Sequence, residues 1–174
     1  ADAEAPLILA GDSAGGNLAA VMAIRARDRG GPPIALQALI YPVTGCDFSR
    51  PSYASPENEL MLTREGMIWF WDHYLPETSR RKEPDASPLH ADDLSGLPPA
   101  VILTAEFDVL RDEGEAYAER LAEANVPTDL KRYAGQMHGF FSLLMLPGSE
   151  LGFQQVVKAV KACIAKARKA QLTN

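Results

Sequence analysis

The chain is 174 residues long, the length of one domain, and its 47% hydrophobic and 23% charged residues are ordinary for a soluble globular protein. Lys and Arg total 17 against 23 Asp and Glu, and this net charge of −6 argues against a nucleic-acid-binding protein. No apolar run reaches transmembrane length, so we expect no membrane span.

The first predicted elements are a strand and a helix joined by a glycine-rich turn. Residues 7–10 are apolar and predict a short buried strand. Residues 11–15, Gly-Asp-Ser-Ala-Gly, match the pattern G-x-S-x-G, in which a tight turn exposes the serine hydroxyl. Apolar residues at helical spacing then predict a helix over residues 14–29, ended by Gly-Gly-Pro-Pro. This strand–turn–helix context favours a catalytic serine over a chance match to three fixed residues.

Ser13 is therefore the candidate nucleophile. We expect Gly11 and Gly15 to leave room for the backbone to pass closely at the turn. The Ala14 N–H would lie at the start of the helix, where it could donate to an oxyanion formed on the substrate.

The middle of the chain predicts one strand, one helix and two loops. Residues 35–41 are apolar and end at Pro42, which predicts a second strand. Residues 44–56 are rich in Gly, Ser, Pro and Asp and predict a loop, and another polar loop follows from residue 76 to residue 99. Between the loops, residues 63–75 predict a helix with Thr63 as its N-cap. We interpret residues 44–98, approximately, as a cap-like insertion within a single domain, residues 1–174.

The predicted helix in that insertion carries more aromatic residues than one buried stripe needs. They are accompanied by Met67, and Trp69 and Trp71 are the largest of them. Ordinary core packing and the wall of a hydrophobic substrate pocket explain this composition equally well. We take Met67, Trp69 and Trp71 as candidate pocket residues.

The last third of the chain predicts two more strands, each followed by a helix. The strands are residues 100–105 and Thr128–Tyr133, and the helices are residues 112–125 and 151–171. Charged residues in Thr128–Tyr133 indicate a strand at the edge of the sheet, through which a homodimer could form. This alternation of strands and helices predicts an α/β fold with a parallel sheet flanked on both faces.

Candidate partners for Ser13 follow the last two predicted strands. Asp108 lies three residues past the third strand and His138 five past the fourth. In parallel sheets such residues gather beyond the carboxyl ends of the strands. The chain order Ser, Asp, His is that of α/β-hydrolases, so we expect His138 to act as general base and Asp108 to orient it.

Other acids and histidines compete for these roles. Asp112 suits a helix start better, and Asp47 follows the second strand as a weaker alternative. His73 and His90 follow no strand end, so we expect both to be structural or solvated. The two cysteines are far apart and lack metal-ligand spacing, which indicates reduced thiols in a cytoplasmic protein. We expect neither a metal nor a cofactor.

Several motifs together resemble one known family. They are Gly-Asp-Ser-Ala-Gly-Gly-Asn (residues 11–17), Tyr41-Pro42, Asp-Ala-Ser-Pro (residues 85–88), the run from Asp108 to Gly114, and His138-Gly139-Phe140. In this order they resemble the hormone-sensitive-lipase family of α/β-hydrolases. The resemblance implies a carboxylesterase acting on small or short-acyl esters, with Ser13, His138 and Asp108 as its triad.

The chain also departs from that family. The family carries a His-Gly-Gly-type loop upstream of the nucleophile, which supplies further oxyanion donors, and this sequence has none. The chain resembles the C-terminal half, with the nucleophile strand at a bare edge, so we expect a missing N-terminal segment of the same protein as its partner. A non-catalytic ligand-binding protein on the same fold, and a hydrolase of amides or thioesters, are the alternatives.

Overall fold

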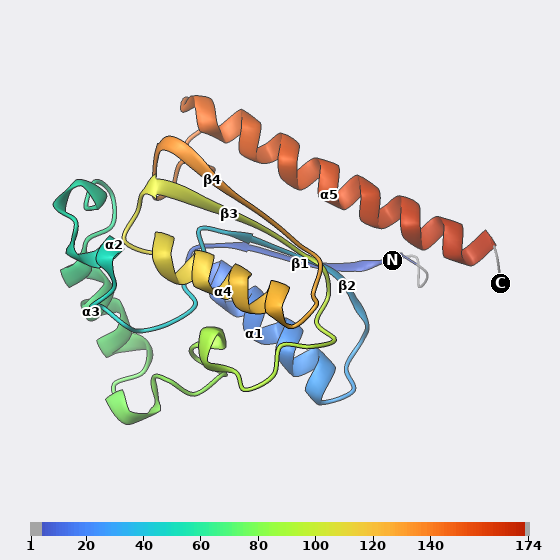
Figure 1. Ribbon diagram of the computed structural model, residues 1–174, viewed down its shortest axis with the longest axis horizontal. Coiled ribbons are helices and arrows are strands. Elements are labelled where there is room, and N and C mark those ends of the chain that lie inside the picture. Colours follow the sequence, from blue (N-terminus) through green and yellow to red (C-terminus); the bar gives the residue numbers. More distant parts are fainter. Residues whose placement is uncertain (1–4, 173–174) are drawn as a thin grey trace.

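The structure, a computed structural model, describes residues 5–172, and these form one four-stranded parallel sheet with helices on both faces (Figure 1). The strands are β1 (Leu7–Asp12), β2 (Ile34–Ile40), β3 (Ala100–Phe107) and β4 (Thr128–Met137), and they lie side by side in chain order. All three pairings are parallel, and β4 is at an edge as its charged residues predicted. The predicted parallel α/β fold is confirmed.

Three strands run further than their sequences predicted, and the first of them, β1, continues to Asp12. β3 continues to Phe107 and β4 to Met137, so Asp108 and His138 each follow their strand directly. The pairing shifts register between Ala105 and Phe107, where Phe107 is opposite Met137. Gly135 and Gln136 in the last part of β4 hid the strand from a pattern based on hydrophobicity.

The helices cover the two faces of the sheet unequally. Helices α1 (Ala14–Asp28) and α4 (Arg111–Glu123) lie on one face, and the long α5 (Pro147–Leu172) lies along the other (Figure 1). Leu39 and Ile102 pack toward α1 and α4, whereas Ile40 and Leu103 belong to the cluster that includes residues of α5. This alternation explains why β2 and β3 are apolar on both faces.

Between β2 and β3, residues 51–75 form a small layer next to the carboxyl ends of the strands, whereas Leu89, Leu94 and Leu97 further along pack into the cluster of α1 and α4. The layer holds α2 (Pro51–Ala54), which composition had predicted as loop, and α3 (Arg64–Tyr74). Pro51 begins α2, a position where its fixed φ favours a helical turn. At the start of α3 the Thr63 side chain accepts a hydrogen bond from the Gly66 N–H at 3.0 Å, so the predicted N-cap is confirmed.

This layer has its own apolar cluster. Met67 and Trp71 of α3 are buried against Tyr53 and against Val109 and Leu110, which follow β3. Within residues 5–172 no helix is long and apolar enough to cross a membrane.

Candidate active site

Ser13 occupies the tight turn between β1 and α1. Its φ is 53° and its ψ is −120°, a conformation that a residue with a side chain rarely adopts. A Cβ on Gly11 would lie 2.2 Å from the Gly15 carbonyl oxygen, so no other residue fits at position 11. Gly15 itself has room, with 3.8 Å to its nearest neighbour, and the expectation of a close approach there was wrong. The second close approach is at Gly16, where a Cβ would lie 2.8 Å from the Pro42 Cβ.

A hydrogen-bonded line connects the three residues at the strand ends. The His138 Nε2 is 3.0 Å from the Ser13 Oγ, and the His138 Nδ1 is 2.8 Å from Asp108 Oδ2. Asp108 is fully buried, and its Oδ1 accepts a hydrogen bond from the Leu110 N–H at 2.9 Å. This geometry lets the imidazole remove a proton from the serine hydroxyl while the carboxylate stabilises the resulting positive charge.

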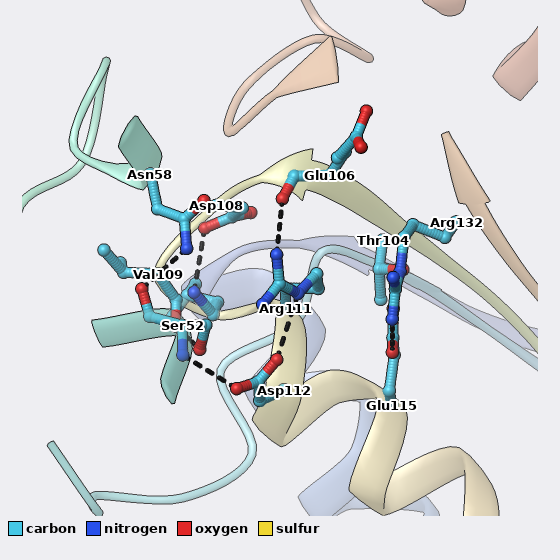
Figure 2. A network of polar contacts seen from close by, with 11 residues as sticks. Ser52, Asn58, Thr104, Glu106, Asp108, Val109, Arg111, Asp112, Glu115 and Arg132 are labelled. Atoms are coloured by element: carbon cyan, nitrogen blue, oxygen red, sulfur yellow. Dashed lines mark hydrogen bonds and ion pairs between the residues drawn. The ribbon is translucent and has the colours of Figure 1, made fainter. Parts of the chain in front are cut away.

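The loop that carries Asp108 is clamped by its neighbours (Figure 2). Arg111 donates to the Glu106 carbonyl at 2.8 Å and to Asp112 at 3.0 Å. Asp112 also accepts from the Ser52 N–H at 2.7 Å, and the Ser52 hydroxyl donates to the Val109 carbonyl at 2.6 Å. Asp112 therefore ties α2 to the start of α4, while Asp108 faces the histidine.

The other candidate acids and bases have partners of their own. Asp47 accepts from the N–H and the hydroxyl of Ser49, which lower the pKa of its carboxyl. The His73 Nδ1 is 2.8 Å from the Trp69 carbonyl in its own helix. Burial lowers the pKa of His90, which lies in a short 3₁₀ turn, Pro88–His90. None of these residues contacts Ser13 in the described structure.

A cavity of about 410 Å³ opens beside Ser13. Its lining is almost wholly apolar and includes no charged side chain, so it suits an uncharged group. The residues that line it are Ser13, Ala14, Asn17, Leu18, Val43, Leu62, Met67, Phe70, Trp71 and Tyr74.

Helix α3 presents one side to this cavity, and Trp69 is on the other side. Met67 and Trp71 line the cavity together with Phe70 and Tyr74, at the spacing i, i+3, i+4, i+7 of one helical face. Trp69 follows Met67 by two residues, about 200° around the helix, so its assignment to the pocket wall was wrong. It is 55% exposed, and its ring contacts Phe70 and His73. Helical spacing counted from Met67 would have found Phe70 and Tyr74.

Asn17 is a site residue that the sequence patterns did not identify. Its buried amide donates to the Val43 carbonyl at 3.0 Å and to the Ala86 carbonyl at 2.8 Å. The Val43 N–H in turn lies 3.2 Å from the Ser13 carbonyl. One side chain on α1 thus holds two neighbouring segments in place, and only the presence of Asn17 in the motif at residues 11–17 hinted at it.

Glu113 is a fully buried carboxylic acid near this site. It accepts from the N–H groups of Thr44 and Gly45 at 2.8 and 3.2 Å and from the Tyr53 hydroxyl at 3.2 Å. Burial nevertheless dominates and raises the pKa of Glu113 to about 8. The folded protein therefore holds a proton here that the unfolded chain releases near pH 4.5.

This buried acid predicts a specific dependence of stability on pH. Below pH 4.5 the raised pKa makes its full contribution to the free energy of unfolding. This contribution is lost as the pH rises toward 8. The free energy of unfolding should fall through this window, by at most about 1.4 kcal/mol per pH unit from Glu113. In Glu113→Gln this component of the slope should disappear, as measured by urea unfolding at pH 5, 6.5 and 8. The exposed Glu119→Gln on the same helix should keep the original slope, and an unchanged slope in Glu113→Gln would contradict the assignment.

This chain is similar to known proteins over most of its length. A family model described as alpha/beta hydrolase fold matches residues 1–142. The carboxylic ester hydrolase LipN of Mycobacterium tuberculosis is 41% identical over 162 residues, which cover 90% of this chain and 43% of LipN. Carboxylesterase NlhH of the same species is 40% identical over 162 residues, 91% of this chain and 51% of NlhH.

Solved structures give the same result. A structure from a study of two fungal esterases of Rhizomucor miehei matches with a TM-score of 0.88 and 46% identity, over 94% of this chain and 52% of the other. A thermostable esterase from Pseudomonas putida matches with a TM-score of 0.73 and 41% identity, over 94% of this chain and 49% of the other. The chain spans about half the length of the curated relatives that it matches.

Proposed function

Because the chain belongs to the α/β-hydrolase family, we propose that it carries the nucleophile, base and acid of a serine carboxylic ester hydrolase. The observation that carries this proposal is the line from Asp108 through His138 to Ser13, with distances of 2.8 and 3.0 Å. The carboxylesterases among its relatives support the choice of an ester as the bond that is cleaved.

The reaction would proceed through an acyl-enzyme. His138 takes the Ser13 proton as the hydroxyl attacks the ester carbonyl, and Asp108 stabilises the imidazolium. The Ala14 N–H begins α1 and has no partner within that helix, so it is available to the oxyanion of the tetrahedral intermediate. His138 then returns the proton to the leaving alcohol, and a water molecule, activated by the same imidazole, releases the acid.

The substrate would be a small or short-acyl ester, bound by its uncharged part in the apolar cavity. The motifs at residues 11–17, 85–88 and 108–114 support membership in the hormone-sensitive-lipase branch of the family. Ala14 supplies one oxyanion donor, whereas such sites use two or more. We expect the remaining donors to come from another segment of the whole protein, whose relatives are about twice as long as this chain.

The nucleophile and the base can be tested with a serine-directed probe. A fluorophosphonate should label the protein expressed from its complete reading frame, and Ser13→Ala should abolish both labelling and hydrolysis of p-nitrophenyl acetate. His138→Ala should lower kcat by several orders of magnitude, as expected on loss of the general base. His73→Ala, a histidine outside the site, serves as the control and should retain activity. Equal labelling of Ser13→Ala would rule out the proposed nucleophile.

The acid can be tested by an isosteric change. Asp108→Asn should lower kcat on the order of 10⁴-fold, because the imidazole loses its orienting carboxylate. Asp47→Asn should leave kcat within about twofold, since removal of an exposed local hydrogen bond has little energetic effect. Steady-state kinetics on the same ester compare the two variants. A larger loss in Asp47→Asn than in Asp108→Asn would reverse the assignment.

The pocket can be tested with two adjacent aromatic residues of similar exposure. Phe70 lines the cavity and is 51% exposed, whereas Trp69 points elsewhere and is 55% exposed. Phe70→Ala should change the ratio of kcat/KM for p-nitrophenyl acetate, butyrate and hexanoate by about 10-fold. Trp69→Ala is the matched control and should preserve the ratio. The opposite result would place the acyl group on the other side of α3.

A further inference from the structure

Tyr41 adopts a strained backbone conformation beside the nucleophile. Its φ is 35°, and among residues 5–172 the other non-glycine residues with positive φ are Ser13 and Asn125. Ser13 and Tyr41 directly follow the adjacent strands β1 and β2, where Asp12 is opposite Ile40. A bulky residue keeps such a conformation only when its surroundings hold it there, and such outliers concentrate at functional sites.

The contacts on both sides of Tyr41 explain how it is held. Its N–H donates to the Leu103 carbonyl at 2.6 Å, which anchors it to β3. The next residue, Pro42, fills the space left by the missing Cβ atom of Gly16 in α1, and it lies in ordinary contact distance, 3.5 Å, of where a Cβ on Gly114 in α4 would be. The backbone thus turns Pro42 toward these two helices, and the Tyr41 ring belongs to the cluster on the α5 side of the sheet.

The Tyr41 ring rests against the candidate base. Its centroid is 4.6 Å from that of the His138 imidazole, with an interplanar angle of 53°. The Tyr41 ring also packs edge-on against the Phe140 ring, with 5.6 Å between the two centroids. Phe140 packs on Tyr133 at 5.0 Å, and the Tyr133 hydroxyl donates to Gln155 of α5 at 2.7 Å. An aromatic row therefore extends from α5 to the imidazole, with Tyr41 as its last member.

The contact with His138 depends on the ring of Tyr41 and not on its hydroxyl. Tyr41 is 1% exposed, and the polar group next to its hydroxyl is Ser142, with which it makes no well-formed hydrogen bond within the described residues. Burial raises the pKa of this phenol, so it stays uncharged. His138 is held at its two nitrogens by Ser13 and Asp108, and these hydrogen bonds leave the ring free to tilt about the line that joins them. An aromatic ring at van der Waals distance on one side restricts this tilt.

We propose that Tyr41 is a positioning residue for catalysis, whose ring fixes the plane of the His138 imidazole between Ser13 and Asp108. This inference rests on the proposed ester hydrolysis. It explains the Tyr41-Pro42 motif, because the hydrogen bonds of His138 to Ser13 and Asp108 do not by themselves fix the plane of the imidazole. Small displacements of a catalytic group reduce kcat strongly, whereas substrate binding in the cavity is independent of Tyr41, which is not among the residues that line it.

The experiment compares ring removal with hydroxyl removal in the protein expressed from its complete reading frame. Tyr41→Phe keeps the ring and should retain kcat within about twofold, since a buried hydroxyl without a partner contributes little. Tyr41→Leu removes the ring and should lower kcat about 10- to 100-fold with KM unchanged. Tyr41→Met, whose flexible side chain fills irregular gaps, replaces it if the leucine variant does not fold.

Tyr117→Leu is the matched control. Tyr117 is also fully buried with an unpartnered hydroxyl, but it packs in the cluster on the opposite face of the sheet. The Tyr117→Leu variant should be destabilised toward urea, as Tyr41→Leu is, but its kcat should remain that of wild type. A kcat within twofold of wild type in the ring-free variants, an equal loss in Tyr117→Leu, or a loss in Tyr41→Phe as large as in Tyr41→Leu would each overturn the proposal.

A second readout separates this inference from the proposed function. The low-field proton resonance of the His138 N–H bonded to Asp108, identified by its absence in His138→Ala, needs no turnover. It should remain in Tyr41→Phe and Tyr117→Leu and broaden or disappear in Tyr41→Leu. If wild type shows no Ser13-dependent hydrolysis, the proposed function fails while this resonance still tests the positioning. An unchanged resonance in Tyr41→Leu would overturn the proposal independently of activity.

Discussion

The close approach of Gly11 to the Gly15 carbonyl is the constraint on which the candidate site depends. Because position 11 carries no side chain, the chain can leave β1 and enter α1 within two residues, and Ser13 takes up the strain of that turn. The turn also presents the first N–H groups of α1 to the same point in space. The position of Ser13 at the start of α1 is therefore a consequence of one backbone contact, and the contact of Gly16 with Pro42 fixes the angle at which the helix leaves.

Three acidic residues within one six-residue stretch have different roles because their surroundings differ. Asp108 is fully buried and faces the imidazole, which supplies its hydrogen bond. Asp112 is partly exposed and clamps Ser52 and Arg111. Glu113 is buried among backbone N–H groups, and the cost of burial raises its pKa to about 8. The residues differ little in chemistry, and their separate tasks follow from what β3 and α4 place around each of them.

The wall of the cavity is joined to the turn at Ser13 by a chain of hydrogen bonds, most of them from a side chain to the backbone. Asn17 holds the Val43 and Ala86 carbonyls, and the segment after Ala86 is fixed in turn, since the Ser87 hydroxyl donates to the Arg81 carbonyl at 2.5 Å. Arg81 donates to Asp72 of α3 and to the carbonyl of Leu75, the residue directly after that helix. The position of α3 relative to Ser13 is thus specified by a short chain of directional contacts together with the apolar cluster beneath it.

The sequence by itself determined the features that local patterns encode. Hydrophobic runs marked β1, β2 and β3, the turn glycines marked Ser13, and Thr63 marked the start of α3, because each depends on residues only a few positions apart. Parallel topology then indicated that Asp108 and His138 would meet Ser13 at one edge of the sheet. Only the tertiary structure decided which face of α3 lines the cavity, where β4 ends, and what Asn17, Glu113 and Tyr41 contact. Their partners lie between 26 and 99 residues away in the chain, as from Asn17 to Val43 or from Tyr41 to Phe140. Contacts of this kind depend on the packing of whole elements, and no periodicity in the sequence records them.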